Sequence, residues 1–157
     1  MIFREASAAD IPAIMALYRK QIGTPGCTWD EEYPALENLA GDIRFHAAFV
    51  LEDEGRILAA ASGGFPPELS DLGIRWRPLQ KPCEWARICS AEHGRGWACL
   101  LLQRLMQEMR VRGYDGFRLL VSAENPAAAA LYRKLGFRPC DETDLYGQHW
   151  LCYQSKE

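Results

Sequence analysis

The sequence predicts a mixed α/β protein that forms one domain over residues 1–157. Three observations favour this fold class. Segments with the two-residue period of strands alternate with segments of helical period along the chain. At 157 residues, of which 48% are hydrophobic, the chain can bury one core but is too short for two ordinary domains. A glycine-rich turn at 94–96 separates a predicted strand from a predicted helix.

The N-terminal quarter is predicted to hold two helices. The first ends near Gln21. Because Pro12 is tolerated only in the first turn of a helix, we expect Asp10 rather than Ser7 to cap it. The other elements expected here are a strand over 2–5, a loop over 27–33 and a second helix over 34–43.

A hairpin and a long loop are predicted next. The acidic turn Asp53-Glu54-Gly55 joins strand-like segments at 45–52 and 56–62, which is typical of a β-hairpin. Residues 63–82 are rich in proline and glycine, so we expect an irregular loop there.

The second half is predicted to alternate strands and helices. Residues 83–90 form a strand whose two-residue alternation places Glu84, Ala86 and Ile88 on one face and Cys83, Trp85 and Arg87 on the other. The elements expected after it are a helix over 97–112, a strand over 116–122, a helix over 126–135, and strands over 137–140 and 146–153.

Charge and composition exclude several classes of protein. A formal charge of −3 and a pI near 5.7 supply no broad cationic surface for nucleic acid. No apolar run approaches the roughly 20 residues of a membrane helix, and the first residues lack a signal peptide, so we expect a cytoplasmic protein. Six cysteines without a Cys-x-x-Cys pair are expected to be reduced thiols. His149 and Cys152 would point to opposite faces of a strand, so no metal site is predicted.

Two segments carry the functional information. The first segment places small residues where a strand turns into a helix, so that backbone N–H groups can face a pyrophosphate; it reads His93-Gly94-Arg95-Gly96-Trp97-Ala98. The second segment puts a tyrosine hydroxyl on a helix, where it can donate a proton; it covers residues 125–137, Asn-Pro-Ala-Ala-Ala-Ala-Leu-Tyr-Arg-Lys-Leu-Gly-Phe. Together they resemble the GCN5-related N-acetyltransferase (GNAT) superfamily. Within it, the segments 27–34 and 145–153 look similar to a group of small bacterial acetyltransferases without an assigned acceptor.

A dinucleotide-binding fingerprint is the alternative interpretation of the glycine turn. Gly94 and Gly96 are followed by Asp115 at about the expected distance. The third glycine of that fingerprint is replaced by Cys99, however, and too little chain follows for a second nucleotide-binding half. We therefore favour the acetyltransferase interpretation.

The resemblance implies a fold and a cosubstrate. The fold is a central, mostly antiparallel sheet with flanking helices, in which strands four and five splay apart. Acetyl-CoA would lie in the gap with its pantetheine arm along the fourth strand. The family signature at this turn is [Gln/Arg]-x-x-Gly-x-[Gly/Ala]. Gly96 and Ala98 match it, whereas His93 occupies the position of the Gln or Arg. The implied cofactor contacts are Ile88, Cys89, His93, Gly94, Arg95, Gly96, Trp97, Ala98, Asn125 and Tyr132.

The resemblance also implies catalytic roles. Tyr132 matches the position of the general acid that protonates the departing thiolate. A glutamate on the fourth strand often deprotonates the amine, which points to Glu84, while His149 on the last strand is an alternative base with a suitable unperturbed pKa. A covalent mechanism through Cys89 is not favoured, because the sequence shows no paired base for it.

The acceptor is expected to be an amine, either on a small molecule or on a protein. In this fold the acceptor pocket is built by the first two helices, their loop and the last hairpin. Aromatic and acidic residues there suit a cationic amine, and the candidates are Trp29, Glu31, Tyr33 and Tyr146. The resemblance is compatible with a homodimer joined through terminal strands. A catalytically inactive acyl-CoA-binding sensor is the alternative function.

Overall fold

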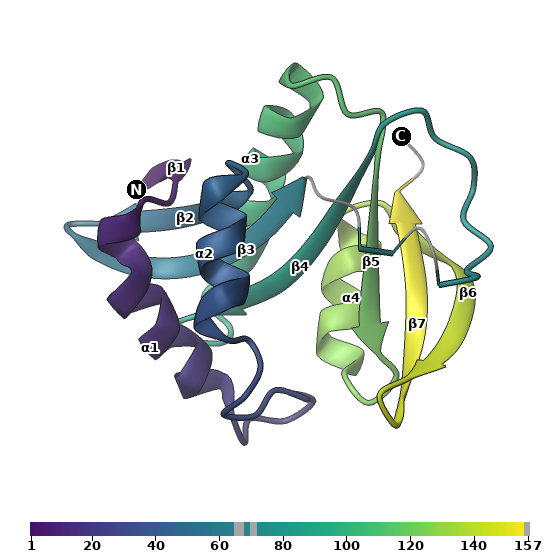
Figure 1. The fold of residues 1–157 in the computed structure, drawn as a ribbon, viewed down its shortest axis with the longest axis horizontal. Helices are drawn as coiled ribbons and strands as arrows, with labels where there is room; N and C mark the ends of the chain where they lie inside the picture. Colours follow the sequence, from purple (N-terminus) through teal and green to yellow (C-terminus); the bar gives the residue numbers. More distant parts are fainter. Residues whose placement is uncertain (65–67, 70–71, 156–157) are drawn as a thin grey trace.

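A seven-stranded sheet forms the centre of the protein (Figure 1). The computed structural model describes residues 1–64, 68–69 and 72–155. Its strands are β1 (Ile2–Glu5), β2 (Ala48–Asp53), β3 (Arg56–Gly64), β4 (Pro82–Ser90), β5 (Gly116–Ser122), β6 (Phe137–Leu145) and β7 (Gln148–Ser155). Its helices are α1 (Ile11–Gln21), which follows a short 3₁₀ turn over Ala8–Asp10, α2 (Leu36–Arg44), α3 (Trp97–Val111) and α4 (Pro126–Lys134).

The strands follow the order β1-β2-β3-β4-β5-β7-β6. Every neighbouring pair is antiparallel except β4 and β5, which are parallel. The mixed α/β class and the mostly antiparallel sheet are therefore confirmed.

β4 and β5 separate after a short contact. They pair only at residues 82–84 and 116–118, although both strands continue well beyond this point. Figure 1 shows the two strands together at one end and diverging toward the other. The predicted splay is confirmed, and in the part of the chain that the structure describes no strand pairs with this edge of β4 from residue 85 onward.

Hydrophobic cores cover both faces of the sheet. On one face, α3 contributes Leu101, Leu102, Leu105 and Met109, and Tyr132 of α4 joins the same cluster. On the other face, Ile14 and Leu17 of α1 and Leu39 of α2 pack on β2, β3 and Cys89. The amphipathic patterns of these helices therefore reflect burial against the sheet.

A β-bulge in β4 overturns the predicted alternation of its side chains. Cys89 lies opposite Ala60 but Ala86 lies opposite Ser62, so the register shifts between them. Arg87 takes a φ of +50° at this bulge, and its side chain points toward α2 and Ser62. Ile88 instead packs with Trp85 on the α3 face. The prediction that Ile88 shares a face with Glu84 and that Arg87 shares one with Trp85 was wrong, because one extra residue reverses the alternation.

Three predicted boundaries also shift. α2 begins at Leu36 rather than at residue 34. β2 begins at Ala48 rather than 45, because Phe45 and His46 terminate α2, with His46 in the left-handed region at φ +57°. β6 continues to Leu145 rather than stopping at 140, since a bulge beyond Pro139 lets the strand resume its pairing with β7. Among the described residues, no helix is both long and apolar enough to cross a membrane.

Candidate active site

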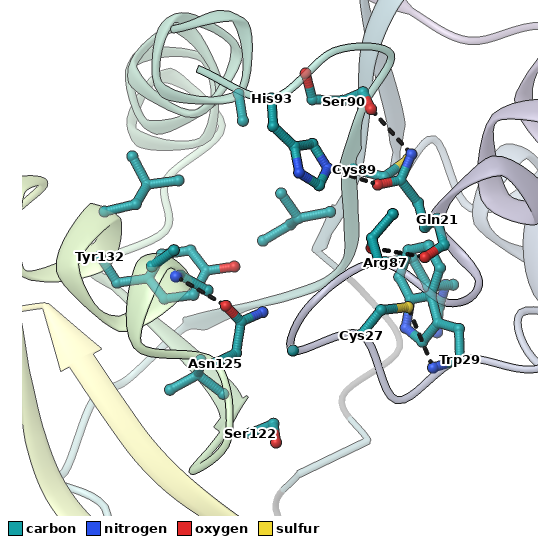
Figure 2. A pocket seen from close by; sticks show the side chains of 18 of the residues that line it. Gln21, Cys27, Trp29, Arg87, Cys89, Ser90, His93, Ser122, Asn125 and Tyr132 are labelled. Atoms are coloured by element: carbon teal, nitrogen blue, oxygen red, sulfur yellow. Dashed lines mark hydrogen bonds between the residues drawn. The ribbon is translucent and has the colours of Figure 1, made fainter. Parts of the chain in front are cut away.

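The opening between β4 and β5 holds a cavity of about 440 Å³. Figure 2 shows its two walls, with Tyr132 and Asn125 on one side and Cys89 and Gln21 on the other. Nine of the ten predicted cofactor residues line it, namely Ile88, Cys89, His93, Gly94, Gly96, Trp97, Ala98, Asn125 and Tyr132. Arg95 does not; its guanidinium bonds to Glu92 at 3.1 Å and is largely exposed.

The N-terminus of α3 supplies backbone donors to one end of the cavity. Gly94 and Gly96 take φ values of +78° and +79°, which only glycine adopts at little cost. The first i→i−4 bond of the helix runs from Leu100 N–H to the Gly96 carbonyl at 3.0 Å, so the N–H groups of residues 97–99 precede it. Together with the positive end of the helix dipole, these groups suit an anion such as a pyrophosphate.

His93 is held by a residue far away in the sequence. Its Nε2 lies 3.2 Å from Oε1 of Gln21, the last residue of α1. The Gln21 carboxamide N–H groups donate to the Ser90 carbonyl at 2.9 Å and the Leu17 carbonyl at 3.2 Å. Sequence reasoning missed Gln21, since nothing in the pattern of α1 marks it as a neighbour of the glycine turn.

Tyr132 projects its hydroxyl into the cavity from α4 (Figure 2). Asn125 caps this helix by accepting the Ala128 N–H at 3.1 Å, which sets the position of the first turn. The Tyr132 ring is buried and meets Phe137 edge-on at 6.0 Å between centroids. Burial raises the pKa of the Tyr132 hydroxyl, so the group keeps its proton near neutral pH. It can therefore act as a proton donor.

The loop between α1 and α2 crosses the cavity and touches its opposite wall. Gly26 packs so closely on Asn125 that an added Cβ would lie 2.7 Å from Asn125 Cγ. Cys27, Thr28 and Trp29 of the same loop line the cavity. The Gly26–Asn125 contact thus connects the α1–α2 loop with the loop that follows β5, across the opening between β4 and β5.

Replacing Gly26 by alanine should disturb this contact. We expect Gly26→Ala to lower the free energy of unfolding by about 1–3 kcal/mol more than Gly23→Ala, and to weaken acetyl-CoA binding. Gly23 is a matched control, because its φ of +84° carries the same backbone cost while no atom lies within 4 Å of an added Cβ. Chemical denaturation of both variants measures the difference. Equal losses would show that the contact has no energetic importance.

Glu84 lies where β4 and β5 are still paired, opposite Arg118. Trp85, its neighbour in β4, lines the cavity, but Glu84 does not. Its Oε1 accepts the backbone N–H groups of Glu68 and Leu69, while its buried Oε2 has no hydrogen-bond partner among the residues that the structure describes. Burial raises the pKa of Glu84, and the two backbone hydrogen bonds oppose that rise. A buried carboxylate with one unpaired oxygen can accept a proton or bind a cation.

His149 lies away from the cavity. It is exposed on β7, where its Nδ1 is 2.7 Å from Asp144 Oδ1. This hydrogen bond is the main reason that the pKa of His149 is raised. The structure therefore does not bring the two predicted bases together. Neither lines the cavity, although each is the chain neighbour of a lining tryptophan, Trp85 for Glu84 and Trp150 for His149.

A buried ion pair supports the bulge of β4. Arg87 donates from Nε and Nη2 to the two carboxylate oxygens of Asp42 at 2.8 and 2.7 Å. Its remaining contacts include the hydroxyls of Tyr33 at 3.2 Å and Ser62 at 3.3 Å. The sequence signal for this pair was an arginine inside a central strand, where a buried guanidinium requires a charged or polar partner.

The four predicted acceptor residues are not gathered at one place. Trp29 lines the cavity, whereas Glu31, Tyr33 and Tyr146 do not. Tyr33 reaches Arg87, Glu31 is exposed in the α1–α2 loop, and Tyr146 is 91% exposed at the tip of the β6–β7 hairpin. Trp150, an aromatic residue of the last hairpin that was also expected in the acceptor pocket, lines the cavity as well. No group of three or more His, Cys, Asp or Glu residues able to hold a metal occurs within the described ranges.

Comparison with known proteins gives a consistent result. A family model described as the acetyltransferase (GNAT) family matches residues 13–137. The L-methionine sulfoximine/L-methionine sulfone acetyltransferase of Pseudomonas aeruginosa is 26% identical over 161 residues, covering 94% of this chain and 88% of that protein. A GNAT-family acetyltransferase from Streptococcus agalactiae superposes with a TM-score of 0.83 at 24% identity, covering 99% and 95% of the two chains. The ribosomal-protein-alanine N-acetyltransferase of Brucella melitensis gives 0.75 at 27% identity, covering 99% of both.

Proposed function

The chain belongs to the acetyltransferase (GNAT) family, and from this premise we propose that it acetylates the α-amino group of a small amino acid, with Tyr132 as general acid. Membership makes it an acyltransferase that uses acetyl-CoA as cosubstrate. The observation that carries the proposal is the buried Tyr132 hydroxyl facing a cavity that begins at the N-terminus of α3.

The residues of the cavity fit the cosubstrate. The N–H groups at the start of α3 would hold the pyrophosphate, and the unpaired edge of β4 beyond residue 84 would hold the amide groups of the pantetheine arm. Acetyl-CoA supplies the acetyl group as a reactive thioester. Tyr132 holds a proton at Oη for the departing sulfur, because burial keeps its hydroxyl protonated. Burial also raises the pKa of the Cys89 thiol, which favours direct attack by the amine over a cysteine-linked route.

Glu84 is the base that we propose. Its Oε2, which has no hydrogen-bond partner among the described residues, can accept a proton, and its chain neighbour Trp85 lines the cavity. His149 is less suitable because its imidazole is exposed and bonded to Asp144. Since burial raises the pKa of Glu84, activity should rise with pH through a value above that of an ordinary glutamate, roughly 4.3.

Replacing each base separately distinguishes them. Glu84→Gln keeps an oxygen for the Glu68 and Leu69 N–H groups but removes the base, so we expect kcat/KM to fall about 100-fold. His149→Gln should leave kcat/KM within about twofold, as expected for a surface substitution away from the site. Steady-state rates from pH 5 to 9 provide the test. A large loss in His149→Gln with full activity in Glu84→Gln would reverse the assignment.

The class of acceptor rests on the named relatives. One acts on methionine sulfoximine and methionine sulfone, which are amino acids, and another on the alanine of a ribosomal protein. We favour the free amino acid because that relative matches 94% of this chain in sequence. The aromatic rings of Trp29 and Trp150 provide surfaces for an ammonium group.

An acyl-CoA sensor without turnover is the second candidate, because His93 departs from the family signature. Calorimetric titration with acetyl-CoA, with NAD as control, combined with a thiol-release assay separates the two functions. Tight acetyl-CoA binding without thiol release on any amine would favour the sensor. Release that depends on both acetyl-CoA and an amine would support the enzyme.

A further inference from the structure

We propose that Gln21 of α1 is a positioning residue for acetyl-CoA, acting through His93 on the turn that precedes α3. This inference rests on the proposed function, since it assumes that the turn receives the pyrophosphate. It concerns a residue outside both family motifs and explains how histidine can serve where the signature has Gln or Arg.

Gln21 contacts both ends of the segment that leads into the turn. Its Nε2 donates to the carbonyl of Ser90, the last residue of β4, at 2.9 Å, and its Oε1 lies 3.2 Å from His93 Nε2. One buried carboxamide, 7% exposed, therefore fixes the strand end and the imidazole three residues later. Figure 2 shows Gln21 reaching from one wall of the cavity toward His93 and Ser90.

The contacts of the carboxamide determine the tautomer of His93. Because Nε2 of Gln21 donates to two carbonyls, its Oε1 must be the atom that faces the imidazole. A carbonyl oxygen only accepts, so His93 donates from Nε2. The neutral ring then leaves Nδ1 as an acceptor. The ring orientation is set by Gln21 before any ligand arrives.

An ordered turn lowers the entropic cost of binding. The residues of the turn, 92–96, are mostly exposed, so they have few packing contacts that would order them. Ser90 Oγ donates to the Glu92 carbonyl at 2.7 Å, and the hydrogen bond between His93 and Gln21 ties the turn to α1. Gln21 should therefore affect the affinity for acetyl-CoA rather than the chemical step.

A double-mutant cycle tests this role. We expect Gln21→Leu and His93→Ala each to weaken acetyl-CoA binding about 3- to 10-fold in calorimetry and to raise KM for acetyl-CoA by a similar factor, with kcat unchanged. The double variant should bind no more weakly than Gln21→Leu alone, because Gln21→Leu already removes the link to His93 together with the hydrogen bond to the Ser90 carbonyl. Gln103→Leu, on the exposed face of α3, is the control and should bind like the wild type.

Rescue by a conservative variant gives a second test that does not disturb α1. His93→Gln restores the residue of the family signature and an N–H donor to Gln21, so its affinity should stay within about twofold of the wild type. Two results would overturn the inference and leave the proposed function standing. One is that the affinity losses of the two single variants multiply in the double variant, and the other is that His93→Gln loses as much affinity for acetyl-CoA as His93→Ala. Failure of the wild type to bind acetyl-CoA would overturn both.

Discussion

Replacing Tyr132 by phenylalanine is expected to lower kcat about 100-fold while leaving acetyl-CoA affinity nearly unchanged. Phenylalanine fills the same buried space beside Phe137, so only the hydroxyl is lost. Without that proton donor the sulfur must depart as a thiolate, which raises the barrier of the step in which it leaves. The expected pattern is a loss in kcat and in kcat/KM by equal factors, as for an interaction made only in the transition state.

Steady-state kinetics and calorimetry on the same preparations measure these quantities. Tyr153→Phe is the matched control, because Tyr153 is a buried tyrosine of β7 that does not line the cavity. Tyr153→Phe should keep the kcat of the wild type. Turnover by Tyr132→Phe at the wild-type rate would remove the hydroxyl from the mechanism.

The largest effect on stability is expected at Asp42. Replacing Asp42 by leucine leaves the Arg87 guanidinium, whose side chain is only 4% exposed, without its bidentate partner. The Glu68 carboxylate remains 3.9 Å from Arg87 Nη2, but it is exposed and beyond hydrogen-bond distance. Loss of the hydrogen-bonded partner of this buried charge should therefore cost about 3–5 kcal/mol, a large part of the roughly 5–15 kcal/mol that keeps a domain folded. Urea denaturation followed by circular dichroism measures the loss.

The double variant Asp42→Leu/Arg87→Met separates the cost of an unpaired charge from the value of the pair. Replacing both partners with apolar side chains removes the uncompensated charge, so most of the lost stability should return. Because Arg87 occupies the β4 bulge, the double variant should nevertheless bind acetyl-CoA more weakly than the wild type. A single variant as stable as the wild type would show that the ion pair does not stabilise the fold.

Local sequence patterns predicted the elements of the cofactor cavity well. The turn at 94–96 needs residues that tolerate positive φ, and the chain places Gly94 and Gly96 there. Asparagine directly before a proline is a typical start of a helix, and the Asn125 side chain does accept the Ala128 N–H. These features depend on neighbours within a few residues, so the sequence displays them directly.

Features that depend on contacts across the sheet were harder to predict. The bulge at Arg87 reversed the expected faces of β4, because an extra residue in one strand leaves no mark on the pattern of polarity. The link from Gln21 to His93 joins residues 72 positions apart. Glu84 was preferred to His149 through the family resemblance alone, whereas the differences that the structure shows between them lie in burial and hydrogen bonding rather than in residue type.

Mass spectrometry of the reaction products tests the central claim most directly. The full chain would be incubated with acetyl-CoA and either L-methionine sulfone or a peptide with an N-terminal alanine. We predict acetylation of the α-amino group of the free amino acid, matched by an equal release of CoA thiol. Acetylation of the peptide alone, or binding of acetyl-CoA without acetylation of any amine, would contradict the proposal that this protein is an amino acid N-acetyltransferase.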